Sequence, residues 1–118
     1  MTSPLAGRRL LIVEDEYFLA DDLASTLRAE GAEVVGLASN VDAALEMLES
    51  AGVIDGAVVD LNLQGEMAYP VADALRAQNI PFVFATGYDL TAIEPGYRDL
   101  PRCEKPVKAQ RIAQLLFG

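Results

Sequence analysis

The sequence predicts an α/β fold in which a parallel sheet of five strands is doubly wound, with helices on both faces. Four short apolar runs are too brief for helices and too apolar for solvent-facing strands, so they are typical of the central strands of a parallel sheet. Segments with helical spacing separate them, and this alternation favours an α/β sandwich. The expected strands are Leu10–Val13, Val34–Leu37, Ala57–Val59 and Phe82–Ala85, with a fifth near Pro101–Glu104.

Helices are expected between these strands because apolar residues recur there at spacings of three and four. Asn40 can cap the second helix, and Gly31 and Gly52 follow the first and second as helix-ending residues. The apolar stripes are Phe18, Leu19, Leu23 and Leu27 in the first helix; Ala44, Leu45 and Leu48 in the second; Val71, Ala74 and Leu75 in the third; and Ile112, Leu115 and Leu116 in the last.

Two segments depart from this regular pattern. Residues 89–100 should hold the fourth helix, but Pro95 and Gly96 interrupt it, so we expect a short or mobile helix there. Residues 1–7 resemble a loose lead-in. The remaining residues, 8–118, are expected to form one domain with no output domain after it.

Composition excludes several classes of function. The 118 residues fit one domain, and a net charge of −9 with no dense Lys/Arg stripe argues against binding to nucleic acid or to an anionic membrane. Histidine is absent, which removes Ser-His-Asp and Cys-His catalysis. Cys103 is the only cysteine, and no apolar run is long enough for a signal peptide or membrane span. We therefore expect a cytoplasmic protein.

Three acidic residues fall where predicted strands end. Glu14 and Asp15 follow the first strand and Asp60 follows the third, so a strand order of 2-1-3-4-5 would bring them together at the carboxyl edge of the sheet. Glu14 and Asp15 alone could be an ordinary solvated helix start. Asp60, however, has apolar neighbours on both sides. Two carboxylates about 5 Å apart repel by about 3 kcal/mol at an effective dielectric of roughly 20, so the cluster favours a bound Mg²⁺.

A hydroxyl and an ammonium group complete the set. Thr86 ends the fourth strand and Lys105 follows the fifth. Taken singly, Thr86 is an ordinary turn residue before a glycine, and Lys105 is an ordinary exposed lysine beside a proline. Their joint placement with the acids at one edge of the sheet favours a site for phosphoryl chemistry.

With these residues in place, the chain resembles the response-regulator receiver domains of two-component signalling, from Arg8 to Phe117. The resemblance rests on LLIVEDE, VVDLNL, FATG and EKP, and it implies a flavodoxin-like (βα)5 fold. It also implies that Asp60 is the phosphoacceptor and that Glu14, Asp15, Asp60 and the backbone carbonyl of Asn62 bind Mg²⁺. Thr86 and Lys105 would contact the phosphoryl oxygens.

A narrower resemblance lies in PFVFATGY, residues 81–88, and in NLQGEMAYPV, residues 62–71. Both are similar to the single-domain FAT GUY receivers of alphaproteobacterial general stress signalling. This implies a sensor histidine kinase of the HWE or HisKA2 type, or a histidine phosphotransfer protein, as partner. Most receivers carry an aromatic residue where this chain has Arg102, so we expect Tyr88 to take over the role of the switch residue.

The expected protein is thus a monomeric response regulator, not an enzyme with a separate substrate, which signals through protein contacts or by competing for phosphoryl groups. The first alternative is a pseudo-receiver that binds partners without being phosphorylated. A second alternative is an aspartyl-phosphate phosphatase. Such an enzyme would carry its nucleophile after the first strand and would have a cap insertion, whereas Asp60 follows the third strand and the chain has no room for a cap. A flavin module would need hydroxyls and amides where Glu14 and Asp15 stand.

Overall fold

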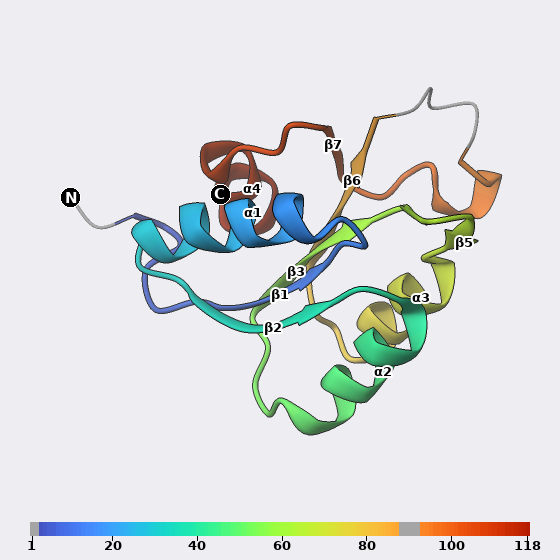
Figure 1. Ribbon diagram of the computed structural model, residues 1–118, viewed down its shortest axis with the longest axis horizontal. Coiled ribbons are helices and arrows are strands. Elements are labelled where there is room, and N and C mark those ends of the chain that lie inside the picture. The colour runs from blue at the N-terminus through green and yellow to red at the C-terminus, as the bar shows by residue number, and fades with distance from the viewer. Residues whose placement is uncertain (1–2, 88–92) are drawn as a thin grey trace.

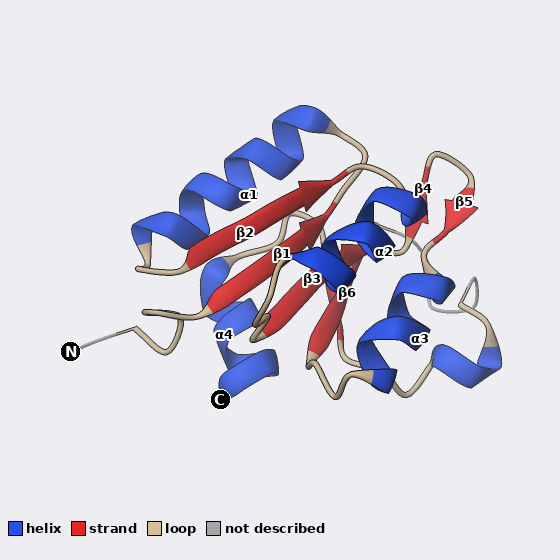
Figure 2. Ribbon diagram, turned by 90° about the horizontal axis from the view of Figure 1, so that it is seen from below, coloured by secondary structure: helices blue, strands red, loops and turns tan. Residues whose placement is uncertain are grey.

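The computed structural model, which describes residues 3–87 and 93–118, has a five-stranded parallel sheet between two layers of helices (Figures 1 and 2). The strands lie in the order β2-β1-β3-β6-β7. In chain order this is the predicted 2-1-3-4-5 arrangement, which is confirmed. The bounds are β1 Arg9–Val13, β2 Glu33–Ala38, β3 Gly56–Asp60, β6 Phe82–Thr86 and β7 Arg102–Glu104.

The helices divide between the two faces of the sheet (Figure 2). Helices α1 (Tyr17–Ala29) and α4 (Ala109–Phe117) cover one face, and α2 (Val41–Ser50) and α3 (Tyr69–Ala77) cover the other. As predicted, the Asn40 side chain caps α2, accepting a hydrogen bond of 2.8 Å from the backbone N–H of Ala43. None of the described helices has the length and hydropathy needed to cross a membrane.

Two of the interior strands, β3 and β6, are buried along their whole length. Every residue of β3 and β6 is buried, which explains why their sequences are continuous apolar runs rather than alternating ones. Successive side chains point to opposite faces of the sheet, so each strand contributes to two cores. Leu11, Val13, Val59 and Phe84 pack toward α2 and α3, whereas Leu10, Ile12, Val58 and Val83 pack toward α1 and α4.

The predicted apolar stripe of the first helix was wrong at its beginning. Phe18 is 85% exposed and Leu19 is 42% exposed, whereas Ala20, Ala24 and Leu27 are buried. At about 100° per residue, nine positions place Phe18 on the side of the helix opposite Leu27. The buried face of α1 thus consists of two small alanines and Leu27, not of the large residues at the start of the helix.

Residues 3–7, the first that the structure describes, are packed rather than loose. Leu5 is fully buried among residues of α1, β1 and α4, and the backbone N–H of Gly7 donates a 2.9 Å hydrogen bond to the carbonyl of Gly31. The expectation of a loose lead therefore fails for residues 3–7, because one leucine in the segment reaches the core.

A small antiparallel hairpin that the sequence did not predict lies between β3 and α3. Its strands, β4 (Asn62–Leu63) and β5 (Glu66–Met67), are two residues each, too short to produce an alternating pattern. Gln64 and Gly65 form the turn with φ angles of 54° and 91°. This turn requires positive φ at both positions, which glycine adopts without strain.

The predicted fourth helix lies partly outside the described residues, which resume at Ile93. From there to Leu100 the chain contains only the 3₁₀ turn η2, Pro95–Tyr97. This segment packs against α3: the rings of Tyr97 and Tyr69 stack with centroids 4.2 Å apart, and the Tyr69 hydroxyl accepts a 2.9 Å hydrogen bond from the Glu94 backbone.

Candidate functional site

The carboxyl edge of the sheet collects the residues that sequence reasoning singled out. Glu14 and Asp15 follow β1, Asp60 ends β3, Thr86 ends β6, and Lys105 follows β7. The strands are parallel, and Asp60 pairs with Ala85, the residue before Thr86. The shared strand direction therefore brings residues that are far apart in the chain to one edge.

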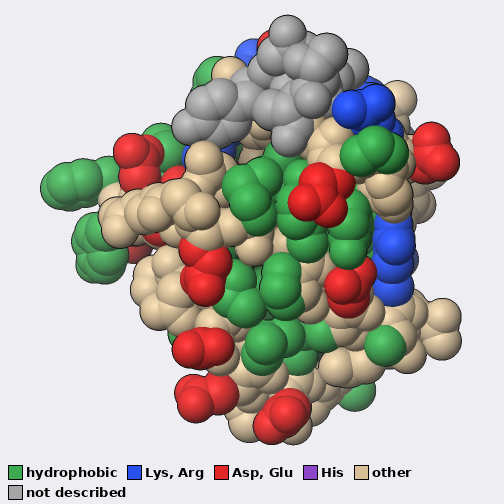
Figure 3. All heavy atoms as spheres, turned by 90° about the vertical axis from the view of Figure 1, so that its right-hand side faces the viewer, with side chains coloured by type: hydrophobic (Ala, Val, Ile, Leu, Met, Phe, Trp, Pro, Cys, Tyr) green, Lys and Arg blue, Asp and Glu red, His purple; other side chains and the backbone are tan. Residues whose placement is uncertain are grey.

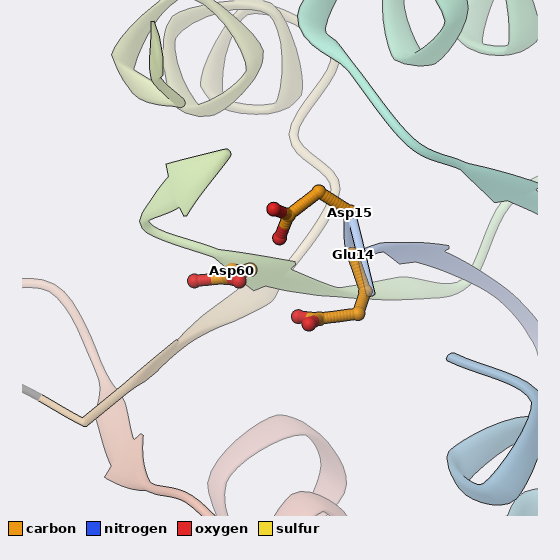
Figure 4. A group of neighbouring side chains, drawn as sticks. All are labelled: Glu14, Asp15 and Asp60. Carbon is orange, nitrogen blue, oxygen red and sulfur yellow. The ribbon is translucent and has the colours of Figure 1, made fainter. Parts of the chain in front are cut away.

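The three acidic side chains face the same space (Figure 4). Each can place one carboxylate oxygen within 4.8 Å of the others. Glu14 and Asp60 are buried, with 8% and 5% of their surface exposed, and Asp15 is partly buried. Glu14 and Asp15 come from the loop between β1 and α1, and Asp60 comes from β3.

Lys105 lies between the two buried acids. Its Nζ is 2.8 Å from Asp60 Oδ2 and 3.1 Å from Glu14 Oε2. The lysine side chain is 27% exposed, against 7% for Glu14 and 6% for Asp60. One ammonium thus offsets part of the charge of two desolvated carboxylates.

The acidic cluster shifts the pKa values of its members. Burial raises the pKa of Glu14 from 4.5 to about 7, and the nearby Asp60 adds to the shift while Lys105 opposes it. Burial and Asp60 also raise the pKa of Asp15. Burial lowers the pKa of Lys105, but its hydrogen bonds to Asp60 and Glu14 outweigh burial, so the net shift is upward. The site is therefore short of positive charge.

This donor set fits a hard divalent cation. Carboxylate oxygens are the ligands that Mg²⁺ prefers, and a single lysine leaves three clustered acids incompletely compensated. Glu14, Asp15 and Asp60 are the residues that would hold the ion.

A cleft of about 490 Å³ opens over these residues. It is lined by Asp15, Asp60 and Lys105 from the site, by Leu19 of α1, and by the turn between β4 and β5. The sequence predicted Leu19 to lie in the core, and it did not predict that the turn between β4 and β5 would form one side of the cleft. The cleft is large enough to admit a phosphoryl donor to Asp60.

The sequence matches the response regulator receiver domain family over residues 10–116. The chain belongs to this family. Receiver domains are phosphorylated by histidine kinases in two-component systems, and they bind Mg²⁺ at an acidic pocket of this kind.

Relatives and solved structures agree with this assignment. Over 112 residues the chain is 33% identical to the sensory transduction protein LytT of Bacillus subtilis, covering 92% of this chain but only 46% of LytT. SdrG from Sphingomonas melonis Fr1 superposes with a TM-score of 0.79 at 41% identity, covering 97% of this chain and 95% of SdrG. The BeF₃-activated conformation of SdrG gives a TM-score of 0.76 at 38% identity, covering 97% of this chain and 94% of that one.

The other residues predicted for the site lie at different places relative to the acidic cluster. Thr86 is buried at the end of β6, and its carbonyl accepts a 3.1 Å hydrogen bond from the Lys105 backbone. The backbone N–H of Asn62 donates a 3.2 Å hydrogen bond to Asp60 Oδ1. The Arg102 side chain makes its hydrogen bond away from the acids: it donates to the carbonyl of Arg98, in the segment that precedes β7. Tyr88 lies outside the described residues.

Proposed function

We propose that this receiver domain accepts a phosphoryl group from phosphohistidine onto Asp60. The observation that carries the proposal is the position of Asp60: a buried carboxylate beside two further acids, 2.8 Å from the Lys105 ammonium, in the wall of an open cleft. A nucleophile needs this combination of access from one side and compensation of charge from the other.

The transfer forms one bond and breaks one. A carboxylate oxygen of Asp60 attacks the phosphorus in line, the bond from phosphorus to the imidazole nitrogen breaks, and that nitrogen keeps the electron pair. The product is an aspartyl phosphate and an unphosphorylated histidine. Attack of water on the same phosphorus then gives inorganic phosphate, restores the carboxylate and releases a proton.

The residues around Asp60 stabilise the charge that spreads over the transferring oxygens. Lys105, already within hydrogen-bond distance of Asp60, supplies an ammonium, and Thr86 supplies a hydroxyl from the end of β6. Mg²⁺, held by Glu14, Asp15, Asp60 and the Asn62 carbonyl, would neutralise charge on the same oxygens. The domain performs this self-phosphorylation and dephosphorylation without turning over a separate substrate.

A protein donor fits the surroundings of the cleft. Leu19 lines the cleft, and the two preceding residues, Tyr17 and Phe18, are 73% and 85% exposed with their rings edge to face at 6.0 Å. Exposed aromatic rings at the start of the helix that borders the cleft favour recognition of a protein surface. From the PFVFATGY resemblance we take the donor to be a sensor kinase of the HWE or HisKA2 type, in general stress signalling.

Output is proposed to pass through protein contacts or through competition for phosphoryl groups. The face that includes α3 and β5 carries hydrophobic side chains with acidic ones among and beside them and basic ones along one edge, and this mixed surface suits a protein partner better than nucleic acid (Figure 3). Arg102 stands where most receivers carry the aromatic switch residue, and its side chain contacts Arg98. Tyr88 therefore remains our candidate for the residue that senses the phosphoryl group.

The test is phosphorylation by acetyl phosphate, followed by intact mass. Wild type should gain one phosphoryl group with Mg²⁺ and almost none with a chelator, and Asp60→Asn should gain none under either condition. Equal labelling of wild type and Asp60→Asn contradicts the assignment. A wild type that is never labelled by acetyl phosphate or by phosphorylated kinases favours the pseudo-receiver alternative.

A further inference from the structure

The hairpin formed by β4 and β5 carries Asn62, whose carbonyl is proposed to bind the cation. Two strands of two residues are too short to hold their own position in water. The geometry of the cation site therefore depends on what anchors the hairpin to the rest of the domain.

The side of the hairpin nearest the sheet is anchored by burial and by backbone hydrogen bonds. Leu61 and Leu63 are 1% and 4% exposed. The Leu61 N–H donates to the Ala85 carbonyl at 3.2 Å, and the Leu61 carbonyl accepts from Ala68 at 2.9 Å. Within the turn, the Asn62 side chain accepts a hydrogen bond of 2.6 Å from Gly65, so its amide is committed to the hairpin itself.

The outer strand is held by the half-buried Met67, which packs against the core, and by a side-chain contact of the acid beside it. Glu66 is exposed, and its Oε1 accepts a 3.3 Å hydrogen bond from the backbone N–H of Val41, the first residue of α2. This N–H has no partner within its own helix, because it belongs to the first turn. The capping residue, Asn40, accepts its hydrogen bond from Ala43 and not from Val41. Figure 2 shows the hairpin beside that end of α2. The negative charge of Glu66 is also favourable there, because a helix begins with partial positive charge.

We propose that Glu66 is a positioning residue for the cation site: by joining β5 to the start of α2, it holds the hairpin so that Asn62 stays beside Asp60. This inference rests on the proposed function. Glu66 itself contacts neither the ion nor the phosphoryl group. Its loss should weaken Mg²⁺ binding by loosening the hairpin, while the three acids remain in place.

The experiment compares three variants of the full chain. Glu66→Ala removes the acceptor and the charge, Glu66→Gln keeps an acceptor oxygen without the charge, and Glu49→Ala removes one exposed acid from the opposite end of α2. Mg²⁺ affinity is measured from backbone amide chemical shifts. Hydrogen exchange of the Val41 and Gly65 amides reports on the hairpin, and circular dichroism checks folding.

Glu66→Ala should raise the Mg²⁺ dissociation constant about tenfold and speed exchange at Val41 and Gly65, as expected when a group that orients a metal ligand is lost. Glu66→Gln should recover most of the affinity, and Glu49→Ala should match wild type. If Glu66→Ala binds Mg²⁺ as Glu49→Ala does, or if Glu66→Gln is as weak as Glu66→Ala, the positioning role is wrong. A wild type that binds no Mg²⁺ would instead overturn the proposed function.

Discussion

Replacing Lys105 with alanine should destabilise the protein, and the loss should depend on pH and Mg²⁺. The substitution removes the ammonium that lies 2.8 Å from Asp60 and 3.1 Å from Glu14. Removing one partner of a fully buried ion pair costs about 3–5 kcal/mol. Lys105 is about a quarter exposed, and Glu14 can be protonated, so we expect about 1–3 kcal/mol at pH 8 in a chelating buffer.

The stability that Lys105→Ala loses should change with pH because of the protonation of Glu14. Lys105 lowers the pKa of Glu14, so its removal raises that pKa further and favours the neutral acid. Below about pH 6 Glu14 is then mostly protonated, and the variant should lose less stability than at pH 8. Saturating Mg²⁺ should restore part of the stability at pH 8, because the ion replaces the missing positive charge.

The assay is urea unfolding followed by circular dichroism at pH 5.5 and pH 8, with a chelator or with Mg²⁺. Lys108→Ala is the matched control, since Lys108 is exposed and its loss changes the net charge equally. Equal stability of Lys105→Ala and Lys108→Ala at pH 8 in the chelator would refute the idea that Lys105 compensates the buried acids.

Three further outcomes are expected. In the chelator, wild type should lose stability as the pH rises from about 4.5 to 7, because folding raises the pKa of Glu14 to about 7; Mg²⁺ should flatten that profile, and a flat profile without Mg²⁺ would count against the shift. Leu5→Ala should cost about 2 kcal/mol or more in urea unfolding, whereas Val53→Ala, at a residue 67% exposed, should cost little; equal costs would contradict the packing of the N-terminal segment. Phe18→Ser should slow phosphotransfer from a phosphorylated kinase more than Val53→Ser does, without slowing labelling by acetyl phosphate; equal kinase rates would mean that Phe18 does not contact the kinase.

The sheet could be predicted from sequence because its strands are buried on both faces. A run such as Phe82–Ala85 has no polar alternation, and its length separates it from a helix. The convergence of Glu14, Asp15, Asp60 and Lys105 followed from the parallel order alone, since each stands at the end of a strand or within two residues after it. Both features depend only on where a residue lies along the chain.

The features that the sequence did not reveal depend on which way a side chain points or on a single contact. Phe18 and Leu19 fit a loose apolar spacing, but the face of α1 that is buried carries Ala20, Ala24 and Leu27. Leu5 lacks any periodic neighbours, so nothing marked it as a core residue. The contact between Glu66 and Val41 joins a two-residue strand to a helix 25 positions earlier, and no local pattern encodes such a pairing.

Borohydride reduction identifies the residue that carries the phosphoryl group, which we propose is Asp60. Reduction of an aspartyl phosphate converts the residue to homoserine, which peptide mass spectrometry locates in the chain. After reaction with acetyl phosphate and Mg²⁺, we expect homoserine at position 60 and at no other aspartate. Homoserine at Asp15 or elsewhere, or none in a protein that has gained a phosphoryl group, would contradict it.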